Sequence, residues 1–499
     1  MCSSDLLREL IANRAAAAES DAVLGVDFGT SGLRVSWLTT DAPDPLEELH
    51  SSPYPGPFSD PIAWRDGLVS LVRRLPADRR RRVAAIALDG TSGTLLLCRP
   101  DGSLLGGPLG HALPYSLACP DQAEALAALA LEGPAASVSG SVARALRLLE
   151  AARSAGASGP LWLRHQADWL MGWLLGDWRW GEEGNNLRLG WDLQQRDWGG
   201  QLRAQPWSGA LPQICGSGEI LGALCPAAAA ALDLPPTTVV VAGSTDANAA
   251  VLAAAPAEGD GVTVLGTTLV LKQFVDRPLQ GPGVSCHRVG GRWLVGGASN
   301  GGAGLLLRFF SPSQLEELSD QIDPSHPTGL HLRPIPARGE RFPWDDPTLE
   351  PVLEPRPVSD ALYLQALLEG LTELERAGWE RLQALGAPPL QRVITVGGGA
   401  RNRQWRALRE RALGVPVLQM LCSGRGRNDW QGSAIGLGPL DLSLQVALPE
   451  LDGRIGTRVA AFKEFIADVR GGQFPKTEHV IKAQGDLIEK FVAAAGKQK

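Results

Sequence analysis

Two aspartates in this sequence stand where an apolar strand gives way to glycines and hydroxyl residues. The first, Asp27, lies near the end of the apolar run 23–28, one residue before Gly29-Thr30-Ser31-Gly32. A carboxylate in a buried strand is costly to desolvate, so it usually has a purpose such as binding a hydrated divalent cation. The glycines that follow let backbone amides approach an anion closely, and Thr30 adds a hydroxyl donor. A plain hairpin turn is the alternative interpretation.

The second aspartate, Asp246, ends Gly243-Ser244-Thr245-Asp246 after the expected strand 238–242, and it opens a helix rich in small residues. A carboxylate at a helix start can be an N-cap and nothing more. The same position also suits a general base that takes the proton from an attacking hydroxyl, because rigid elements fix its reach.

Three further turns carry residue types that suit phosphates, a nucleoside or a polyol. Gly266-Thr267-Thr268 joins the expected strands 262–265 and 269–274, and Gly397-Gly398-Gly399 lies before a helix that begins at Asn402. Three glycines leave a flat backbone against which a purine or ribose could lie, with Asn402 and Trp405 as polar and stacking partners. The stretch 89–94 supplies short hydroxyls, Ser92 among them, at a strand's carboxyl end, which suits a polyol. Ordinary loops are the alternative for each turn.

The elements that must position these residues alternate between strands and helices. Strand, Gly-Thr turn and strand occur twice, at 23–38 and 262–274, which predicts a duplicated two-domain α/β architecture. Apolar periodicity and length predict helices and further strands between these hairpins. The expected helices are 62–75, 143–152, 162–175 and 361–385, and the expected strands include 83–88, 238–242 and 393–396.

The composition excludes several classes of nucleotide and nucleic-acid binder. The chain has 499 residues, a net charge of −7 and 47 basic residues, but only one lysine, Lys272, precedes Lys463. A Walker A loop and a protein kinase both need a lysine in a defined motif, and nothing around Lys272 fits either. The acidic balance argues against nucleic-acid binding. Scattered cysteines, no apolar run of 18 residues and no secretory signal predict a cytoplasmic protein without a membrane segment.

Taken in order, these motifs resemble the FGGY carbohydrate kinases. The stretches 89–94, 296–300 and 338–343 are further similar to a cyanobacterial and plant plastid branch, called xylulose-kinase-like and associated with D-ribulose phosphorylation. The resemblance spans residues 22–420. It implies two duplicated actin/Hsp70-like (ribonuclease H-like) ATPase domains around a central cleft. The motifs that carry it are Asp27-Phe28-Gly29-Thr30, Gly243-Ser244-Thr245-Asp246, Gly266-Thr267-Thr268 and Gly397-Gly398-Gly399-Ala400-Arg401-Asn402.

The resemblance also implies roles for single residues, with ATP and Mg²⁺ as cofactors. Asp246 corresponds to the catalytic base and Asp27 to the metal- and sugar-facing carboxylate, and both would hold the metal, directly or through water. The acceptor sugar would contact Asp27, Asp246 and Ser92. The residues expected on the phosphate side of ATP are Gly29, Thr30, Gly266, Thr267 and Thr268, and those expected at its adenosine are Gly398, Gly399, Asn402 and Trp405.

The implied activity is transfer of the γ-phosphoryl group of ATP to the terminal hydroxyl of a pentulose, D-ribulose first. Alternatives are D-xylulose or another polyol as acceptor, and a nonenzymatic actin/Hsp70-like nucleotide switch. One departure from the family pattern weakens the assignment of D-xylulose as the acceptor. Many xylulose and glycerol kinases carry a Trp-x-Asp-x-Arg sugar loop, whereas residues 111–116 read His-Ala-Leu-Pro-Tyr-Ser.

A second departure sets a boundary near the C-terminus. Residues after 421 match the family poorly, and six of the seven lysines lie after residue 462. The end of the chain faintly resembles ketopantoate hydroxymethyltransferases, so a frameshift or gene fusion is one hypothesis and a divergent native tail is the other. The expected organisation is an N-terminal extension (1–21), a sugar-binding domain (22–245), a nucleotide-binding domain (246–421) and this tail (422–499).

Overall fold

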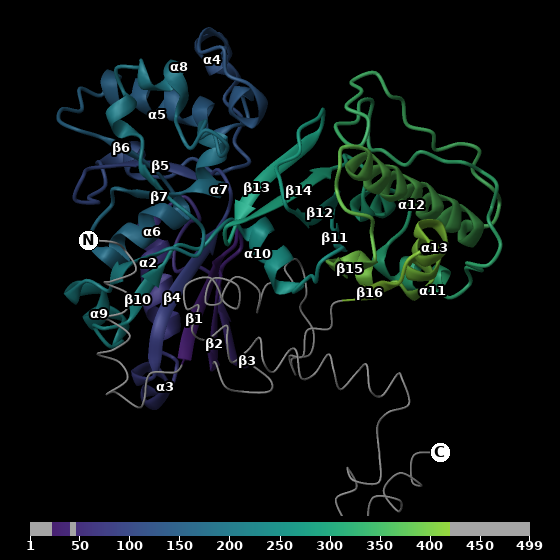
Figure 1. Cartoon of the computed structure of the whole chain (residues 1–499), viewed down its shortest axis with the longest axis horizontal. Coiled ribbons are helices and arrows are strands. Elements are labelled where there is room, and N and C mark those ends of the chain that lie inside the picture. The colour runs from purple at the N-terminus through teal and green to yellow at the C-terminus, as the bar shows by residue number, and fades with distance from the viewer. Residues whose placement is uncertain (1–21, 40–45, 420–499) are drawn as a thin grey trace, which may run out of the picture. The chain divides into compact units, whose positions relative to one another are not determined.

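The computed structural model describes residues 22–39 and 46–419. All of these residues belong to one compact unit of the chain. The main described elements are two six-stranded sheets with their helices (Figure 1). Within the described ranges, no helix combines the length and apolar character needed to cross a membrane.

The first sheet has the strand order β3-β2-β1-β4-β10-β9. Its first three strands form an antiparallel meander, whereas β4 runs parallel to β1 and β10 runs parallel to β4. β1 and β4 are buried along their whole length, as expected for strands covered on both faces. The strands are β1 (Ala22–Phe28), β2 (Leu33–Thr39), β3 (Leu46–Ser52), β4 (Val83–Gly90), β9 (Ile220–Ala223) and β10 (Val239–Val241).

Three helices form a hydrophobic core with the first sheet: α2 (Pro61–Val72), α6 (Gln166–Leu175) and α9 (Pro226–Leu232). Trp64 of α2 and Trp169 of α6 meet edge to face in this core, with ring centroids 6.4 Å apart. The alternate residues of β1 and β4, such as Val23 and Ala85, belong to a separate small cluster. Because both faces of β1 and β4 are covered, each strand appears in the sequence as a short, continuous apolar run, which is why it could be recognised there.

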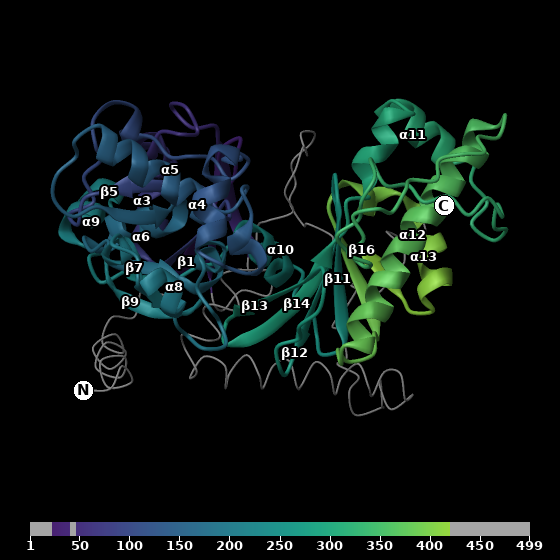
Figure 2. The same ribbon diagram turned by 90° about the horizontal axis from the view of Figure 1, so that it is seen from above.

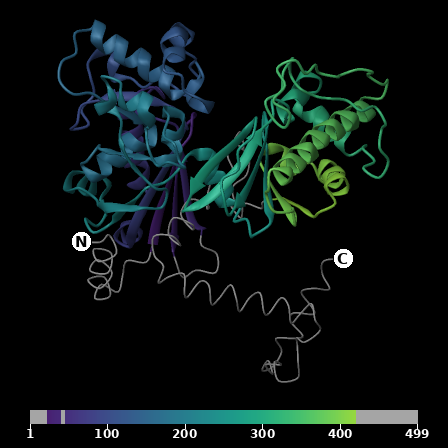
Figure 3. The same ribbon diagram turned by 45° about the horizontal axis from the view of Figure 1, so that its top comes forward.

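The second sheet has the order β13-β14-β12-β11-β15-β16, and its last five strands repeat the arrangement of β3-β2-β1-β4-β10 in the first. β11 and β12 form an antiparallel hairpin like β1 and β2, and β15 and β16 continue the sheet in parallel from β11. β13 and β14 form a long antiparallel ribbon, teal in Figure 3. The strands are β11 (Asp260–Leu265), β12 (Leu269–Val275), β13 (Val284–Val289), β14 (Arg292–Ala298), β15 (Arg392–Val396) and β16 (Val417–Gln419).

Helices α12 (Asp360–Ala384) and α13 (Arg403–Leu413) pack side by side on the second sheet, and α11 (Pro312–Ser319) packs on α12 (Figure 2). Helix α10 (Asp246–Ala253) contributes Val251 and Leu252 to a separate cluster with Val262, Phe274 and Leu294 of the second sheet. The predicted duplicated α/β fold is therefore confirmed at the level of sheet topology.

A smaller, mixed region with its own hydrophobic core lies in the first half of the chain. In it β5 (Leu95–Cys98) pairs with β6 (Trp162–His165), and β7 (Trp180–Glu182) pairs with β8 (Gln213–Cys215). The other helices of the first half are α3 (Ala77–Arg81), α4 (Ala123–Ala128), α5 (Ser141–Ser154), α7 (Glu183–Asn186) and α8 (Gly199–Arg203). The 3₁₀ turns are η1 (Gly107–Gly110), η2 (Pro120–Gln122), η3 (Gly133–Ala136), η4 (Leu187–Leu189), η5 (Ser208–Ala210), η6 (Ala303–Arg308) and η7 (Gly398–Arg401).

One predicted element was wrong at its start. A single helix was expected over 162–175, but the first four residues form β6 and only Gln166–Leu175 is helical. A short apolar run does not distinguish a strand from a buried helical turn, and here pairing with β5 decides for the strand.

A buried ion pair joins the helices of the second sheet to its strands. Arg409 of α13 donates from Nε to Glu375 Oε2 at 2.5 Å and from Nη2 to Glu375 Oε1 at 2.7 Å. Thr263 of β11 donates to the same carboxylate at 2.6 Å, and Arg409 also donates to Thr395 of β15 at 2.7 Å. Both charged side chains are at most 2% exposed, so neither can be solvated if its partner is lost.

The first prediction follows from this pair. Arg409→Met should destabilise the fold by about 3–5 kcal/mol, because it leaves the Glu375 carboxylate buried without its counter-charge. Denaturant unfolding of the purified protein measures this. Arg403→Met, at an exposed position of the same helix, should change the free energy of unfolding by less than about 0.5 kcal/mol. Equal effects of the two substitutions would contradict the prediction.

Candidate active site

Three carboxylates meet at the carboxyl edge of the first sheet. Asp27 of β1 and Asp89 of β4 are register partners on adjacent parallel strands. Asp246 is the first residue of α10, which follows β10. Because the carboxyl ends of parallel strands meet at one edge, these side chains converge there. Asp27 and Asp89 are 5% and 2% exposed, whereas Asp246 is only partly buried and remains accessible to a ligand.

A close backbone approach fixes the position of Asp246. A Cβ atom on Gly243 would lie 1.7 Å from the carbonyl oxygen of Leu88, so only glycine fits between β10 and β4. Two residues later, Thr245 forms a parallel bridge with Gly90, and its hydroxyl accepts a hydrogen bond from Asn248 N at 3.3 Å. Thr245 is therefore the N-cap of α10, and the alternative that Asp246 serves as the cap is wrong.

Burial and mutual repulsion shift the pKa values of two of these carboxyl groups. Burial raises the pKa of Asp246 to about 6, and the charge of Asp27 adds to this, whereas the amide of Ala247 and the charge of Arg188 oppose it. Burial, followed by the charges of Asp27 and Asp246, raises the pKa of Asp89 well above its usual range. An acid with a pKa near 6 is largely ionised at neutral pH and can accept a proton, which suits a general base.

The Asp27 carboxylate is held on one side only. Arg34 donates from Nη1 to Asp27 Oδ2 at 2.6 Å, while Asp27 Oδ1 and Asp89 Oδ1 are buried without a hydrogen-bond partner. Free carboxylate oxygens are the donors that a hydrated Mg²⁺ prefers. Across the described ranges, however, no three His, Cys, Asp or Glu side chains are placed to hold a metal ion directly. These residues therefore fit a cation bound through its water molecules and through phosphate oxygens.

The turn after β1 presents the two residues expected on the phosphate side. Tyr54 donates from its hydroxyl to Gly29 O at 2.7 Å, which orders the turn, and Thr30 is exposed. The hydroxyls of Thr30 and Tyr115 lie 3.4 Å apart. Tyr115 comes from the loop that lacks the Trp-x-Asp-x-Arg motif. No local pattern in the sequence pointed to this contact across 85 residues.

Ser92 lies beside Asp246. Its backbone amide hydrogen-bonds to the Asp246 carboxyl group and helps to lower that group's pKa against the larger effect of burial. The loop is held on both sides of Ser92, because Thr91 N donates to Gln166 Oε1 at 3.1 Å and Arg144 Nε donates to Gly93 O at 2.9 Å. The structure therefore brings Asp27, Asp246 and Ser92 to one place and adds Asp89, whose role the sequence did not reveal.

The turn Gly266-Thr267-Thr268 of the second sheet is packed against a second glycine-rich segment. Ala303 N donates to Gly266 O at 3.0 Å, and a Cβ atom on Gly302 would lie 2.5 Å from Thr267 O. Thr267 is exposed, with Gly266 and Thr268 partly so. The turn is thus a rigid feature whose Thr267 side chain remains accessible.

The three glycines after β15 have different environments. Gly397 has a φ of 93°, which favours glycine, and a Cβ atom on Gly399 would lie 2.8 Å from Leu265 Cβ and 2.9 Å from the Trp405 ring. Gly398 is exposed, and nothing lies within 4 Å of the position that its Cβ would take. The fold therefore requires glycine at 397 and 399, but not at 398.

Asn402 and Trp405 both make hydrogen bonds within the protein that stabilise the second half of the fold. Asn402 caps α13 by accepting from Trp405 N at 2.9 Å, and it donates to Ser319 Oγ at 2.8 Å. Trp405 is 1% exposed, and its indole N–H donates to Thr372 Oγ1 at 3.0 Å. The expected stacking of a base on Trp405 is not supported by this position, because the ring lies in the core and supports Gly399 from within the fold.

The two second-half stretches that suggested the D-ribulose branch lie against each other. The carboxylate of Glu340, 2% exposed, accepts from Ser299 Oγ and from Asn300 N, both at 2.7 Å. Asn300 Nδ2 donates to Gly339 O at 3.0 Å. A contact across 40 residues between two short motifs is invisible to local sequence patterns.

Comparisons with known proteins found similarity to a family of sugar kinases. Residues 261–424 match the model of the FGGY family of carbohydrate kinases, C-terminal domain. L-fuculokinase of Escherichia coli is 26% identical over 241 residues, which is 45% of this chain and 50% of that protein. The solved structure of xylulose kinase from Rhodospirillum rubrum superimposes with a TM-score of 0.66 at 22% identity, covering 80% of this chain and 86% of the other.

The C-terminal region matches a different family. Residues 381–497 match the model of CobN/Magnesium Chelatase. The aerobic cobaltochelatase subunit CobN of Pseudomonas aeruginosa is 49% identical over 71 residues, 14% of this chain and 6% of that protein. The faint resemblance to ketopantoate hydroxymethyltransferases is thus replaced by a stronger likeness to another family. The hypotheses about the tail concern residues outside the described part of the chain.

The chain spans about half the length of the curated sugar kinase that it matches and a small fraction of the cobaltochelatase subunit. The structural likeness establishes the two-domain, actin-like ATPase fold. The FGGY model matches the part of the chain that forms the second sheet and its helices. Together with the likeness to L-fuculokinase, this match supports membership of the FGGY carbohydrate kinase family.

Proposed function

We propose that this protein is an ATP-dependent kinase that phosphorylates the terminal hydroxyl of a pentulose, with D-ribulose as its acceptor and D-ribulose 5-phosphate as its product. The observation that carries the proposal is Asp246, a partly exposed carboxylate fixed beside Ser92 and Asp27 with a pKa of about 6. The likeness to L-fuculokinase and to the xylulose kinase structure supports a sugar as acceptor.

In the proposed reaction, Asp246 removes the proton of the acceptor hydroxyl as that oxygen attacks the γ-phosphorus of ATP, the bond from the γ-phosphorus to the β,γ-bridging oxygen breaks, and ADP leaves. Burial keeps the base little solvated, so little water has to reorganise when the proton moves. Ser92 and the Asp27–Arg34 pair bind other sugar oxygens and hold the attacking hydroxyl in place.

Backbone and hydroxyl donors hold the phosphates in this proposal, because the described part of the chain has no accessible lysine for them. Lys272 is the only lysine before Lys463, and it is buried with its Nζ 3.1 Å from Ser285 Oγ. The turns at Gly29-Thr30 and at 266–268 supply amide and hydroxyl donors instead. A bound Mg²⁺, held through water by Asp27 and Asp246, would supply positive charge near the transferred group.

D-ribulose is preferred over D-xylulose for two reasons. The loop at 111–116 lacks the carboxylate and arginine of the Trp-x-Asp-x-Arg motif, and it places Tyr115 beside Thr30 instead. The stretches similar to the D-ribulose branch form the joined cluster around Glu340. An assay of ATP- and Mg²⁺-dependent ADP formation with D-ribulose, D-xylulose, L-fuculose and glycerol tests the choice.

The second prediction concerns the base. With D-ribulose as acceptor, Asp246→Asn should lower kcat by about 10²–10⁴-fold, since it removes the proton acceptor while keeping the shape of the side chain. Nucleotide binding, measured by calorimetry, should change little. Near-normal turnover by this variant would overturn the role of Asp246. Slow ATP hydrolysis by the wild-type protein that no sugar stimulates would instead favour a nucleotide switch.

The third prediction is a pH profile. Asp246 must be ionised to accept a proton, so kcat/KM should be high above pH 7 and should fall as the pH drops through about 6, the raised pKa of this group. An unshifted aspartate would titrate near pH 4. Initial rates with saturating ATP between pH 5 and 9, in buffers of constant ionic strength, locate the midpoint. A kcat/KM that stays constant down to pH 5, as an unshifted aspartate would give, would contradict the assignment.

The fourth prediction separates a structural glycine from a ligand-facing one. Gly398→Ala should leave the midpoint of thermal unfolding unchanged, because its Cβ meets nothing within 4 Å, yet it should raise KM for ATP about tenfold if the nucleoside lies on this backbone. Gly399→Ala is the matched control. It should lower stability by about 1–3 kcal/mol, since its methyl group would overlap Leu265 and Trp405. An unchanged KM for ATP in Gly398→Ala would remove Gly398 from the nucleotide site.

A further inference from the structure

Arg188 is an exposed cation beside the candidate base that the sequence did not single out. It lies in η4, and its Cδ is 3.5 Å from the position that a Cβ atom on Gly93 would take. Gly93 directly follows Ser92, and the charge of Arg188 helps to stabilise ionised Asp246. Among the described residues, no hydrogen-bonded or ion-paired partner of its guanidinium is present. An arginine with five N–H donors thus faces the candidate acceptor site without a protein partner.

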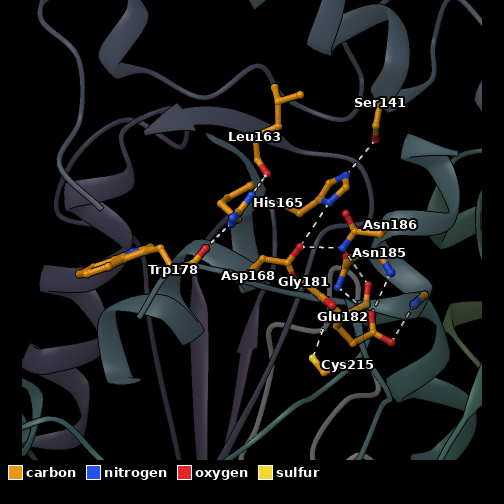
Figure 4. Close-up of polar contacts among 12 residues, drawn as sticks. Ser141, Leu163, His165, Asp168, Trp178, Gly181, Glu182, Asn185, Asn186 and Cys215 are labelled. Carbon is orange, nitrogen blue, oxygen red and sulfur yellow. Dashed lines mark hydrogen bonds and ion pairs between the residues drawn. The ribbon is translucent and has the colours of Figure 1, made fainter. Parts of the chain in front are cut away.

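The segment that carries Arg188 is fixed by two buried carboxylates (Figure 4). Glu182 accepts from the backbone N–H groups of Gly184 and Asn185, both at 2.8 Å. Asp168 accepts from Glu182 N and from Asn186 Nδ2, both at 2.9 Å. Both carboxylates are at most 2% exposed, so these hydrogen bonds do not compete with water.

Both ends of η4 are anchored by this arrangement. Asn186, the residue before Leu187, also donates from Nδ2 to Glu182 O at 2.9 Å, and its own carbonyl accepts from Trp191 N at 3.0 Å. Gly190, with a φ of 101°, ends the turn. The three residues of η4 are therefore held between fixed points, and the direction of Arg188 does not depend on a loose loop.

The same network also reaches the loop that carries Ser92. His165 lies with Nδ1 3.4 Å from Asp168 Oδ2 and Nε2 3.0 Å from Ser141 Oγ (Figure 4). Ser141 begins α5, the helix whose Arg144 donates to Gly93 O at 2.9 Å. Ser141 and His165 are 0% exposed, so this Ser–His–Asp chain is inaccessible to a substrate. His165 thus lies between Asp168 and the start of α5, and its hydrogen bond is the one between Nε2 and Ser141.

We propose that Arg188 binds the acceptor sugar, donating hydrogen bonds to its hydroxyl or carbonyl oxygens, and that Asp168 is a positioning residue that acts through Arg188. The inference rests on the proposed function and extends it to the residue that anchors the acceptor. Loop 111–116 offers no arginine, so η4 supplies the guanidinium from a different element. A donor fixed in advance loses little entropy on binding, which favours affinity and selectivity among sugar epimers.

The fifth prediction tests Arg188. Arg188→Met should raise KM for D-ribulose by about ten- to hundredfold, the usual effect of losing a charged hydrogen bond, with a smaller change in kcat and none in KM for ATP. Arg153→Met, on an exposed turn of α5, is the control and should leave all three constants unchanged. In Arg188→Ala, millimolar guanidinium added to the assay should restore part of the lost kcat/KM, which a merely structural role would not allow.

A double-mutant cycle tests the positioning by Asp168. Asp168→Asn should raise KM for D-ribulose, and its effect should largely vanish when Arg188 is already Met, because both changes remove the same contact. Additive effects would show that Asp168 does not act through Arg188. Circular dichroism and the thermal midpoint of each variant confirm that the fold is retained.

The remaining outcomes separate this inference from the proposed function. Suppose that the wild-type protein phosphorylates D-ribulose. If Arg188→Met then leaves KM for D-ribulose unchanged, whether or not kcat falls, the proposal that Arg188 binds the acceptor is overturned. If wild-type protein phosphorylates another sugar of the panel instead, the same variants measured with that sugar decide in the same way. If it neither turns over nor binds any of these sugars by calorimetry, the proposed function fails, and the acceptor contact fails with it.

Discussion

The close approach of β10 to β4 is the contact on which the candidate site depends. Gly243 lies so near the Leu88 carbonyl that any side chain would overlap it, and the Gly90–Thr245 bridge continues the pairing past the last strand residue. These two contacts carry the parallel register into the start of α10. As a result Asp246, separated by more than 150 residues from Asp89, reaches the same sheet edge. The site is thus a consequence of sheet geometry and not of a flexible loop.

Gathering three carboxylates in one place is unfavourable, and the structure offsets only part of the cost. Arg34 neutralises one side of Asp27, while two buried carboxylate oxygens keep no partner. The remaining repulsion and burial appear as raised pKa values for Asp89 and Asp246. Such unrelieved electrostatic strain is common where a protein needs a proton acceptor near neutral pH or a place for a cation. The same features that weaken the fold locally are those that could perform phosphoryl transfer.

The predictable parts of this structure are those encoded by local patterns. Both strand hairpins, the helix after Asp246 and the helix after Asn402 follow from apolar periodicity and turn residues. Tyr115 beside Thr30, Glu340 beside Ser299 and Arg188 beside Gly93 are contacts between distant segments, and no local pattern encodes them. For Trp405 the sequence suggested a ligand contact that its position does not support. An aromatic residue near a glycine loop is compatible both with stacking on a ligand and with packing in the core. Only its burial decides between them.

The second sheet bears on two features of the sequence, the scarcity of lysine and the change in family likeness near the C-terminus. Lys272, the one lysine in the first 462 residues, is buried in the second sheet with its Nζ 3.1 Å from Ser285 Oγ, so it is not accessible to a ligand. The CobN match begins at residue 381, inside α12, yet the sheet continues without interruption through β15, α13 and β16. Arg409 pairs with Glu375, and β16 pairs with β15, so the elements up to Gln419 complete one fold. The CobN match therefore overlaps the last elements of this fold, residues 381–419.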